Sequence, residues 1–225
     1  MTETKNFSSL ADAAQKVADD MAAALKAAIE ARGQASCVVT GGRSPKAVFP
    51  LLAKADLDWS KVTITLSDER WVETIHHDSN EKLVRDYLLT DKAADATFVG
   101  LKTAETNAPA AQKAVHERIK ALSRPFDAVF LGMGEDGHIA SLFPKNPCLK
   151  AGGLAVASQA SHHPHWRMSL TGLALLDSRR IFLLISGETK RAVLRNAGLS
   201  RDIAELPVRM ILQQDRVPVT VYISD

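Results

Sequence analysis

Short runs of apolar and β-branched residues recur along the chain, and they constrain its fold more than any other feature. They read SCVVT, KVTITL, FDAVFL, RIFLLIS and PVTVYI, at residues 36–40, 61–66, 126–131, 180–186 and 218–223. The last three are almost continuously apolar, which is typical of strands covered by helices on both faces. The sequence therefore predicts a buried, largely parallel sheet.

Helical patterns separate these runs. Apolar residues spaced by three and four positions between Leu10 and Ala28 predict a long amphipathic helix that ends at Gly33. Shorter helices are predicted over 46–54, 79–89 and 108–122. Alternating strands and helices predict an α/β fold. A length of 225 residues with 46% hydrophobic content suffices for one α/β domain or two small ones, and we expect a single domain over residues 1–225.

Composition excludes several classes of protein. With 28 Lys and Arg against 26 Asp and Glu, the net charge of +2 argues against a surface that binds nucleic acid. Cys37 and Cys148 belong to no paired motif, so we expect two buried thiols. The N-terminal segment lacks the pattern of a signal peptide, and no apolar run is long enough to span a membrane. We therefore expect a cytoplasmic protein that does not bind membranes.

Four motifs follow predicted strands, where ligands bind in open α/β sheets. The first, TGGRSP at residues 40–45, places Gly41 and Gly42 in a sharp turn before Ser44 as N-cap and Pro45 as first helical residue. The free backbone N–H groups of such a helix start suit a phosphate, and Arg43 either adds a contact or points away. A plain strand-to-helix turn is the alternative.

The second motif is SDERW at residues 67–71. Asp68 is a candidate proton acceptor or hydroxyl-orienting group, and Arg70 can hold a phosphate or carboxylate through two parallel hydrogen bonds. The alternative is a solvated charged loop with an internal ion pair, since charged clusters are common in loops.

The third motif, LGMGEDGH at residues 131–138, crowds glycines such as Gly134 into one loop and presents His138 at its end. Glycine lets a backbone approach a ligand closely, and histidine exchanges protons near neutral pH. Asp136 is positioned to orient the imidazole and raise its basicity. The alternative is a histidine that caps a following helical turn.

The fourth element comprises WRMSLTG at 166–172 and SGETK at 186–190, each placing a cation near a predicted helix start. Arg167 and Lys190 are the candidates to complete an anion-binding pocket, although a surface position is the ordinary expectation for either residue alone.

In these motifs the chain resembles the 6-phosphogluconolactonases, relatives of the glucosamine-6-phosphate deaminases. GGRSP resembles the glycine-rich phosphate loop of that family, SDERW its Asp-Glu-Arg motif, FDAVFLGMGEDGHIASLFP its signature, and WRMSLT and SGETK its arginine and lysine segments. One departure is Arg43-Ser44, where the family commonly has two small hydroxyl residues.

The resemblance implies a Rossmann-like fold of the deaminase and ribose-phosphate-isomerase type, and hydrolysis of a phosphosugar lactone, 6-phospho-D-glucono-1,5-lactone, without metal or organic cofactor. It implies that His138 is the general base, with the following residues around the substrate: Gly41, Gly42, Ser44, Arg70, Arg167 and Lys190. In chemical terms, neutral His138 deprotonates the attacking water and then protonates the departing ring oxygen.

Other enzymes fit the sequence less well. The chain lacks the G-x-S-x-G motif of a serine hydrolase. A zinc enzyme is disfavoured because the HHPH segment, with His162, His163 and His165, lacks the helical spacing of a zinc motif. The deaminase branch is similar in the same motifs, but it carries a glutamate where this chain has residues 141–144, and an aromatic residue at the position of Arg70.

A sensor of sugar phosphates without catalytic activity is a further alternative. It is disfavoured because no DNA-binding segment precedes residue 33 and because His138 and Arg70 are present. The oligomeric state is open at this level, and we expect a monomer or a weak homodimer. We also expect the segment 157–166, ASQASHHPHW, to be an exposed loop.

Overall fold

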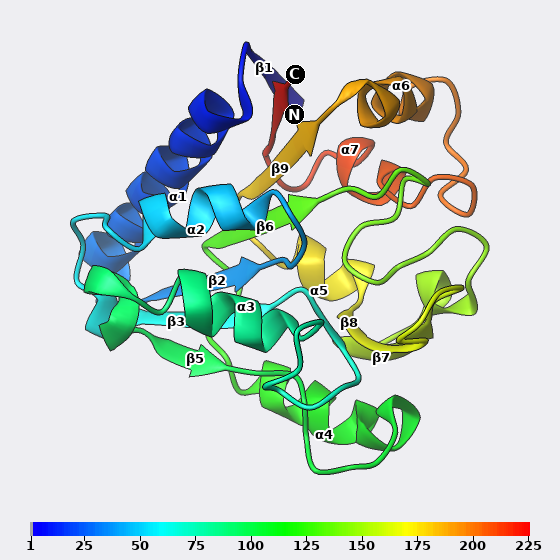
Figure 1. The fold of residues 1–225 in the computed structure, drawn as a ribbon, viewed down its shortest axis with the longest axis horizontal. Helices are drawn as coiled ribbons and strands as arrows, with labels where there is room; N and C mark the ends of the chain where they lie inside the picture. The colour runs from blue at the N-terminus through cyan, green and yellow to red at the C-terminus, as the bar shows by residue number, and fades with distance from the viewer. Residues whose placement is uncertain (1) are drawn as a thin grey trace.

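A seven-stranded parallel sheet forms the centre of the molecule in a computed structural model that describes residues 2–225 (Figure 1). The strand order is β1-β10-β9-β6-β2-β3-β5, and every neighbouring pair is parallel. The strands are β1 Thr2–Phe7, β2 Ala35–Val39, β3 Val62–Leu66, β5 Thr97–Val99, β6 Ala128–Gly132, β9 Ile181–Ser186 and β10 Val219–Ser224. The predicted parallel α/β fold is confirmed.

Helices connect these strands and cover the sheet. They are α1 Leu10–Arg32, α2 Pro45–Leu52, α3 Asn80–Tyr87, α4 Ala108–Lys120, α5 Gly172–Leu176, α6 Glu188–Ala197 and α7 Arg209–Leu212, with 3-10 turns η1 Trp59–Lys61, η2 Asp91–Asp95 and η3 Pro147–Lys150. Gly33 ends α1 with a left-handed φ of 76°, as predicted. The buried face of α1 packs against β2, β9 and β10, and includes Val17, Met21 and Leu25.

A second, antiparallel sheet was not predicted. It has the order β4-β8-β7, with β4 Asp68–Arg70, β7 Ala155–Gln159 and β8 Trp166–Leu170. The expectation of an exposed loop over 157–166 is therefore wrong at both ends, and only the turn between β7 and β8 fits it. Ser158 is buried in β7, where its hydroxyl contacts Cys148 Sγ of η3 at 3.4 Å.

Strand β1 was also missed, since its residues TETKNF are mostly polar and exposed at the edge of the large sheet. Its register with β10, from Thr2 opposite Val219 to Phe7 opposite Ser224, supplies the pairing that the side-chain pattern does not indicate.

Cys37 and Cys148 are free and buried, as predicted. Within residues 2–225, no helix has the length and apolar character needed to cross a membrane.

The order of the strands fixes where a ligand can bind. From β2 the chain runs to β3 and β5 on one side, and then returns to β6, β9 and β10 on the other side. The carboxyl ends of β2 and β6 therefore lie side by side where the strand order reverses, the usual ligand site of open α/β sheets. The loops after both strands carry glycine-rich motifs.

Candidate active site

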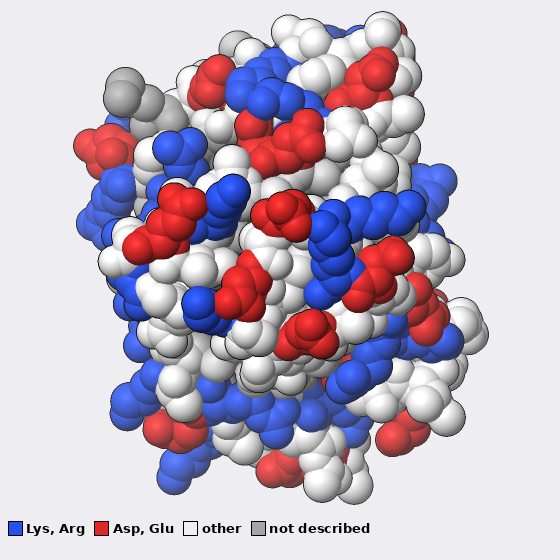
Figure 2. Space-filling view, turned by 90° about the vertical axis from the view of Figure 1, so that its left-hand side faces the viewer, with Lys and Arg blue, Asp and Glu red and all other residues white. Residues whose placement is uncertain are grey.

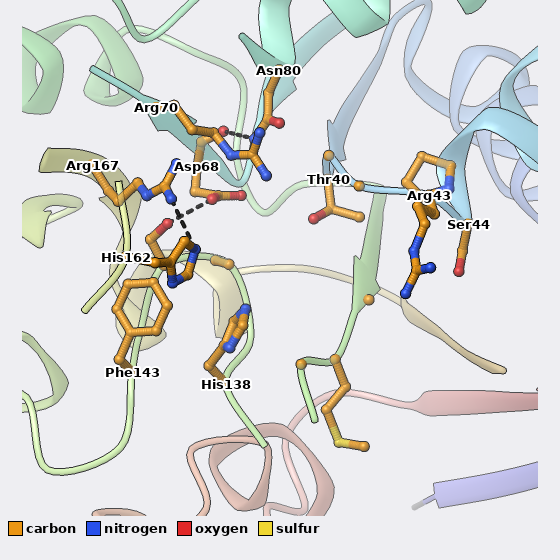
Figure 3. A pocket seen from close by; sticks show the side chains of 18 of the residues that line it. Thr40, Arg43, Ser44, Asp68, Arg70, Asn80, His138, Phe143, His162 and Arg167 are labelled. Atoms are coloured by element: carbon orange, nitrogen blue, oxygen red, sulfur yellow. Dashed lines mark hydrogen bonds between the residues drawn. The ribbon is translucent and has the colours of Figure 1, made fainter. Parts of the chain in front are cut away.

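A cavity of about 290 Å³ opens at the carboxyl ends of β2 and β6 (Figure 3). All the predicted site residues except Asp136 line it: Gly41, Gly42, Arg43, Ser44, Asp68, Arg70, Gly134, His138, Arg167 and Lys190. They come from the loops after β2 and β6, from β4 and β8, and from α6. The fold thus brings together four motifs that are widely separated in the sequence.

His138 and Asp136 form a close pair in the loop after β6. Asp136 Oδ1 lies 2.6 Å from His138 Nδ1 and also accepts the His138 backbone N–H at 3.1 Å. When Nδ1 of a neutral imidazole donates to Asp136, Nε2 carries the free lone pair and can accept a proton. Burial opposes ionisation of Asp136, but its hydrogen bonds with His138 hold the pKa of the carboxyl below its usual value.

The glycines of this loop make room for the imidazole. A Cβ atom at Gly134 would lie 2.2 Å from His138 Nδ1, and Gly137 has a φ of 79°, which favours glycine. The ring packs against Phe143, with the two ring centroids 4.8 Å apart. No helix starts after His138 before η3 at Pro147, so the alternative of a histidine that caps a helical turn is wrong.

The loop after β2 places a helix N-terminus at the cavity. Gly42 has a φ of 107°, and a Cβ at Gly41 would lie 1.8 Å from Asn80 Oδ1. Pro45 is the first residue of α2 and Ser44 its N-cap, as predicted, but the Ser44 side chain makes no capping hydrogen bond. Because that hydroxyl does not cap the helix, it is available to the cavity that it lines.

Arg43 and Lys190 make one of two cation pairs in the cavity. Arg43 is an exposed residue that lines the cavity from the start of α2, and Lys190 lines it from the first turn of α6. Burial lowers the pKa of the Lys190 ammonium and the charge of Arg43 lowers it further, whereas Glu135 opposes this shift. Because the two positive charges repel each other, an anion between them would be stabilising.

Arg70 and Arg167 make the second cation pair. The two residues lie directly opposite each other on β4 and β8, so their side chains share one face of the small sheet. The SDERW segment is thus a strand and not a solvated loop, and Arg70 Nη1 donates to the Asp78 carbonyl at 2.6 Å. Arg167 itself lies within strand β8, and the predicted helix start of this segment follows at Gly172, the first residue of α5.

The guanidinium of Arg167 is buried without a carboxylate partner among the described residues. Its residue is 3% exposed, and its Nε and Nη1 atoms have no hydrogen-bond partner there. Burial lowers the pKa of Arg167 and the neighbouring charge of Arg70 lowers it further, against the opposing effect of Asp68. A buried cation without a carboxylate partner is costly unless an anion lies near it, and because Arg167 lines the cavity, its charge favours an anion at this end.

Asp68 lines the cavity and accepts hydrogen bonds from its neighbours. Its carboxylate accepts hydrogen bonds from Ser67 Oγ at 2.9 Å and from Ser141 Oγ at 2.7 Å. Its backbone carbonyl accepts from Asn80 Nδ2 at 2.8 Å. Sequence reasoning did not assign Ser141 or Asn80 to the site, although both residues line the cavity. Ser79 is the N-cap of α3, which begins at Asn80.

Glu69 was also missed, and it connects two walls of the cavity. Its buried carboxylate accepts the backbone N–H groups of Arg70, Asn80 and Glu81 at 2.7 Å each, and the Ser79 hydroxyl at 3.0 Å. Burial raises the pKa of Glu69 to about 7, while these four hydrogen bonds act in the opposite direction. Successive side chains of a strand point to opposite faces, so Glu69 points away from the face on which Asp68 and Arg70 line the cavity. This alternation was the signal that could have identified Glu69 as a buried residue.

The histidines of the HHPH segment do not gather as metal ligands. His162 lines the cavity, whereas the ring of His163 contacts that of His165 at a centroid distance of 5.6 Å. Among residues 2–225, a group with ligand spacing is formed instead by His76, His77 and Asp78. There, His76 Nδ1 already accepts the Asp78 backbone N–H at 3.1 Å.

The parallel sheet, together with a histidine that lines its switch-point cavity and is paired with an aspartate, defines the chain as an α/β enzyme. The family model of glucosamine-6-phosphate isomerases and 6-phosphogluconolactonases matches residues 8–221, and the chain belongs to this family. A 6-phosphogluconolactonase from Pseudomonas putida is 44% identical over 223 residues, which cover 95% of this chain and 90% of the relative.

Solved structures agree with this assignment. The crystal structure of a 6-phosphogluconolactonase from Shewanella baltica OS155 has a TM-score of 0.97 and 42% identity, and the match covers 100% of this chain and 98% of that one. A monomeric glucosamine-6-phosphate deaminase has a TM-score of 0.82 at 17% identity, with 98% and 97% coverage. The second likeness shows the fold alone, and it confirms the expected deaminase-like architecture.

Proposed function

We propose that this enzyme hydrolyses 6-phospho-D-glucono-1,5-lactone to 6-phospho-D-gluconate, the lactonase step of the oxidative pentose phosphate pathway. The observation that carries the proposal is the imidazole of His138, held 2.6 Å from Asp136 in a cavity with two cation pairs. The substrate has two groups that need positive charge, its 6-phosphate and the oxygen on C1 that becomes anionic. The names of the relatives support the same reaction.

The phosphate binds at the start of α2 in this proposal. Arg43, Lys190 and the backbone N–H groups after Gly42 surround that end of the cavity, and the helix dipole adds to their positive potential. Arg43 and Ser44 lie on the opposite side of the cavity from Arg70 and Arg167 in Figure 3. A phosphate at the first pair therefore directs the lactone ring toward the second.

The reaction takes place at the end of the cavity near His138. Nε2 of neutral His138 removes a proton from water as the water oxygen bonds to C1, and the carbonyl oxygen becomes an oxyanion. Arg70 and Arg167 stabilise this oxyanion. When the bond between C1 and the ring oxygen breaks, the imidazolium returns its proton to the ring oxygen, and the new carboxylic acid releases a proton to solvent.

Asp136 and Asp68 have supporting roles in this mechanism. Asp136 keeps the proton of neutral His138 on Nδ1 and stabilises the imidazolium that forms during the reaction. Asp68 cannot readily act as a base because both of its carboxylate oxygens accept hydroxyl hydrogen bonds, so it orients Ser141 and Asn80. The segment 141–144 offers no carboxylate to the histidine, which favours the lactonase over the deaminase reaction.

The test is formation of 6-phosphogluconate from freshly generated lactone at controlled pH, after subtraction of spontaneous hydrolysis. The wild-type enzyme should accelerate the reaction, and His138→Gln should reduce kcat by about 100- to 10,000-fold, the usual contribution of general base catalysis. His163→Gln is the matched control, because His163 does not line the cavity. If the wild type gives no acceleration, the proposal is wrong, and ammonia release from glucosamine 6-phosphate is the next assay.

A further inference from the structure

Arg167 makes its one side-chain hydrogen bond to a histidine that no catalytic step above uses. Within the described residues, its Nη2 lies 3.3 Å from Nε2 of His162, and its Nε and Nη1 atoms are buried without partners. No carboxylate there lies within ion-pair distance of the guanidinium. Among residues 2–225, His162 is thus the one hydrogen-bond partner of this buried cation.

His162 reaches the cavity from the turn between β7 and β8. The residue is exposed to solvent on the turn, yet its side chain lines the cavity and points toward Arg167 in Figure 3, where a dashed line joins the two. Its neighbours His163 and His165 do not line the cavity. The turn therefore presents one histidine of three to the site.

The chemistry of the contact fixes the protonation state of His162. An arginine guanidinium can only donate hydrogen bonds, so Nε2 of His162 must accept and the ring proton must lie on Nδ1. The charged and titratable groups near the ring are Arg167 on β8, Arg70 on β4, and His138 and Asp136 in the loop after β6. Desolvation lowers the pKa of His162 below its usual value, and Arg167, His138 and Arg70 lower it further, opposed by Asp136.

We propose that His162 is a positioning residue for Arg167: its neutral imidazole accepts from Nη2 and holds the guanidinium in the orientation in which Arg167 lines the cavity, with its positive charge near the oxyanion on C1. The inference rests on the proposed lactonase reaction. It assigns to the β7–β8 turn a part in transition-state stabilisation, because a positive charge that is already oriented costs no reorganisation when the oxyanion forms. A protonated His162 cannot accept from Arg167, so the arrangement exists only in the neutral form.

Kinetics of His162→Ala and His162→Gln test this role. Because removal of an oxyanion donor itself costs about 100- to 1,000-fold in kcat, loss of the group that orients it should cost about tenfold in His162→Ala, with KM changed less. The Gln side chain offers an acceptor oxygen and should restore most of kcat. His163→Gln should match the wild type. A His162→Ala enzyme with unchanged kcat would overturn the proposal.

The pH profile separates positioning from a merely structural effect. General base catalysis needs a neutral His138, and protonation of His162 should itself cost about tenfold, so log(kcat/KM) of the wild type should fall with a slope steeper than 1 over the pH range in which His162 becomes protonated. In His162→Gln this additional fall of about tenfold should disappear, and the slope should not exceed 1. Equal slopes in the two enzymes would contradict the proposal.

Imidazole NMR of protein labelled with ¹⁵N-histidine tests the contact without any activity. The His162 signals, assigned by their loss in His162→Gln, should show the Nδ1–H tautomer and a pKa below the usual value, and Arg167→Met should raise that pKa. An Nε2–H tautomer, or a pKa unmoved by Arg167→Met, would overturn the positioning role. Absence of lactonase activity with the expected NMR result would instead refute the proposed function and with it the oxyanion as the target of Arg167, while the contact itself would stand.

Discussion

At the scale of single residues, the position of His138 depends on the lack of a side chain at Gly134. The imidazole occupies the space that a Cβ at Gly134 would fill, and Asp136 Oδ1 lies 2.7 Å from the same point. The side chains of His138 and Asp136 and the backbone of Gly134 therefore form a single packing unit. The sequence indicated that these glycines let the backbone approach a ligand closely, whereas in the structure Gly134 leaves room for the imidazole of His138.

The first prediction is that Gly134→Ala displaces the imidazole. The new methyl group would lie 2.2 Å from Nδ1, so the ring must move and its hydrogen bond to Asp136 must lengthen. Because a misplacement of about 1 Å can cost about 100-fold in rate, we expect kcat to fall by that order while the melting temperature changes little. Gly152→Ala is the control, since a Cβ there meets nothing within 4 Å. Equal kcat values for the two variants would contradict a fixed imidazole.

At the scale of elements, Glu69 joins β4 to the start of α3. Its four hydrogen bonds hold the backbone of Arg70 and Asn80, which line the cavity from these two elements. In Glu69→Gln, an amide NH2 group replaces one carboxylate oxygen, and it cannot accept the hydrogen bonds that this oxygen accepts. We expect a loss of about 2 to 3 kcal/mol in the free energy of unfolding, the cost of buried donors left unpaired, together with a lower kcat/KM.

Urea denaturation monitored by circular dichroism measures that loss. The control is Glu117→Gln, because the Glu117 side chain is 58% exposed and pairs only with surface groups at 3.6 Å or more. If Glu69→Gln were as stable and as active as the control variant, Glu69 would not connect the two walls of the cavity.

A second cluster at this scale ties α1 to the edge of the large sheet. Asp20 on α1 accepts hydrogen bonds from Lys16 at 2.6 Å, from Lys5 on β1 at 3.2 Å and from the Tyr222 hydroxyl on β10 at 2.6 Å. Burial opposes ionisation of Asp20, but these donors together hold the pKa of its carboxyl below the usual value.

The sign of the resulting pH dependence follows from this lowered pKa. The carboxylate stabilises the folded protein above the usual value of 3.8, and the contribution is lost as pH falls through the folded pKa. Asp20→Asn should therefore be less stable than the wild type at pH 7 by about 1.5 to 3 kcal/mol, and the difference should shrink below pH 3.8. Urea denaturation across this range measures it. A difference independent of pH would contradict the ionised role of Asp20.

The limits of sequence reasoning also lie at this scale. Each strand of the large sheet except β1 and β5 was predicted, because continuous apolar residues indicate burial on both faces. The small sheet was not, since its strands β4, β7 and β8 come from distant parts of the chain and β4 has three residues. Motifs placed Arg70 and Arg167 in the site, but only the pairing of β4 with β8 puts them opposite each other.

At the scale of the whole molecule, the attraction of an anionic substrate must come from the cavity. The net charge is only +2, and acidic and basic side chains are mixed on the face that includes α1 (Figure 2). In contrast, the cavity gathers Arg43, Arg70, Arg167 and Lys190 at the carboxyl end of the sheet. A local concentration of charge in a nearly neutral molecule predicts attraction that acts over a short range.

The last prediction concerns ionic strength. The screening length falls from about 30 Å at 0.01 M salt to about 3 Å at 1 M, so the kcat/KM for the phosphorylated lactone should fall by about tenfold across this range, within the usual span of electrostatic steering. The value for uncharged D-glucono-1,5-lactone should change little. Arg43→Ser should weaken the salt dependence because it removes a cation from the phosphate end, whereas Arg201→Ser, an exposed change outside the active-site cavity, should not. If both variants had the same salt dependence as the wild type, Arg43 would not take part in drawing the phosphate to the start of α2.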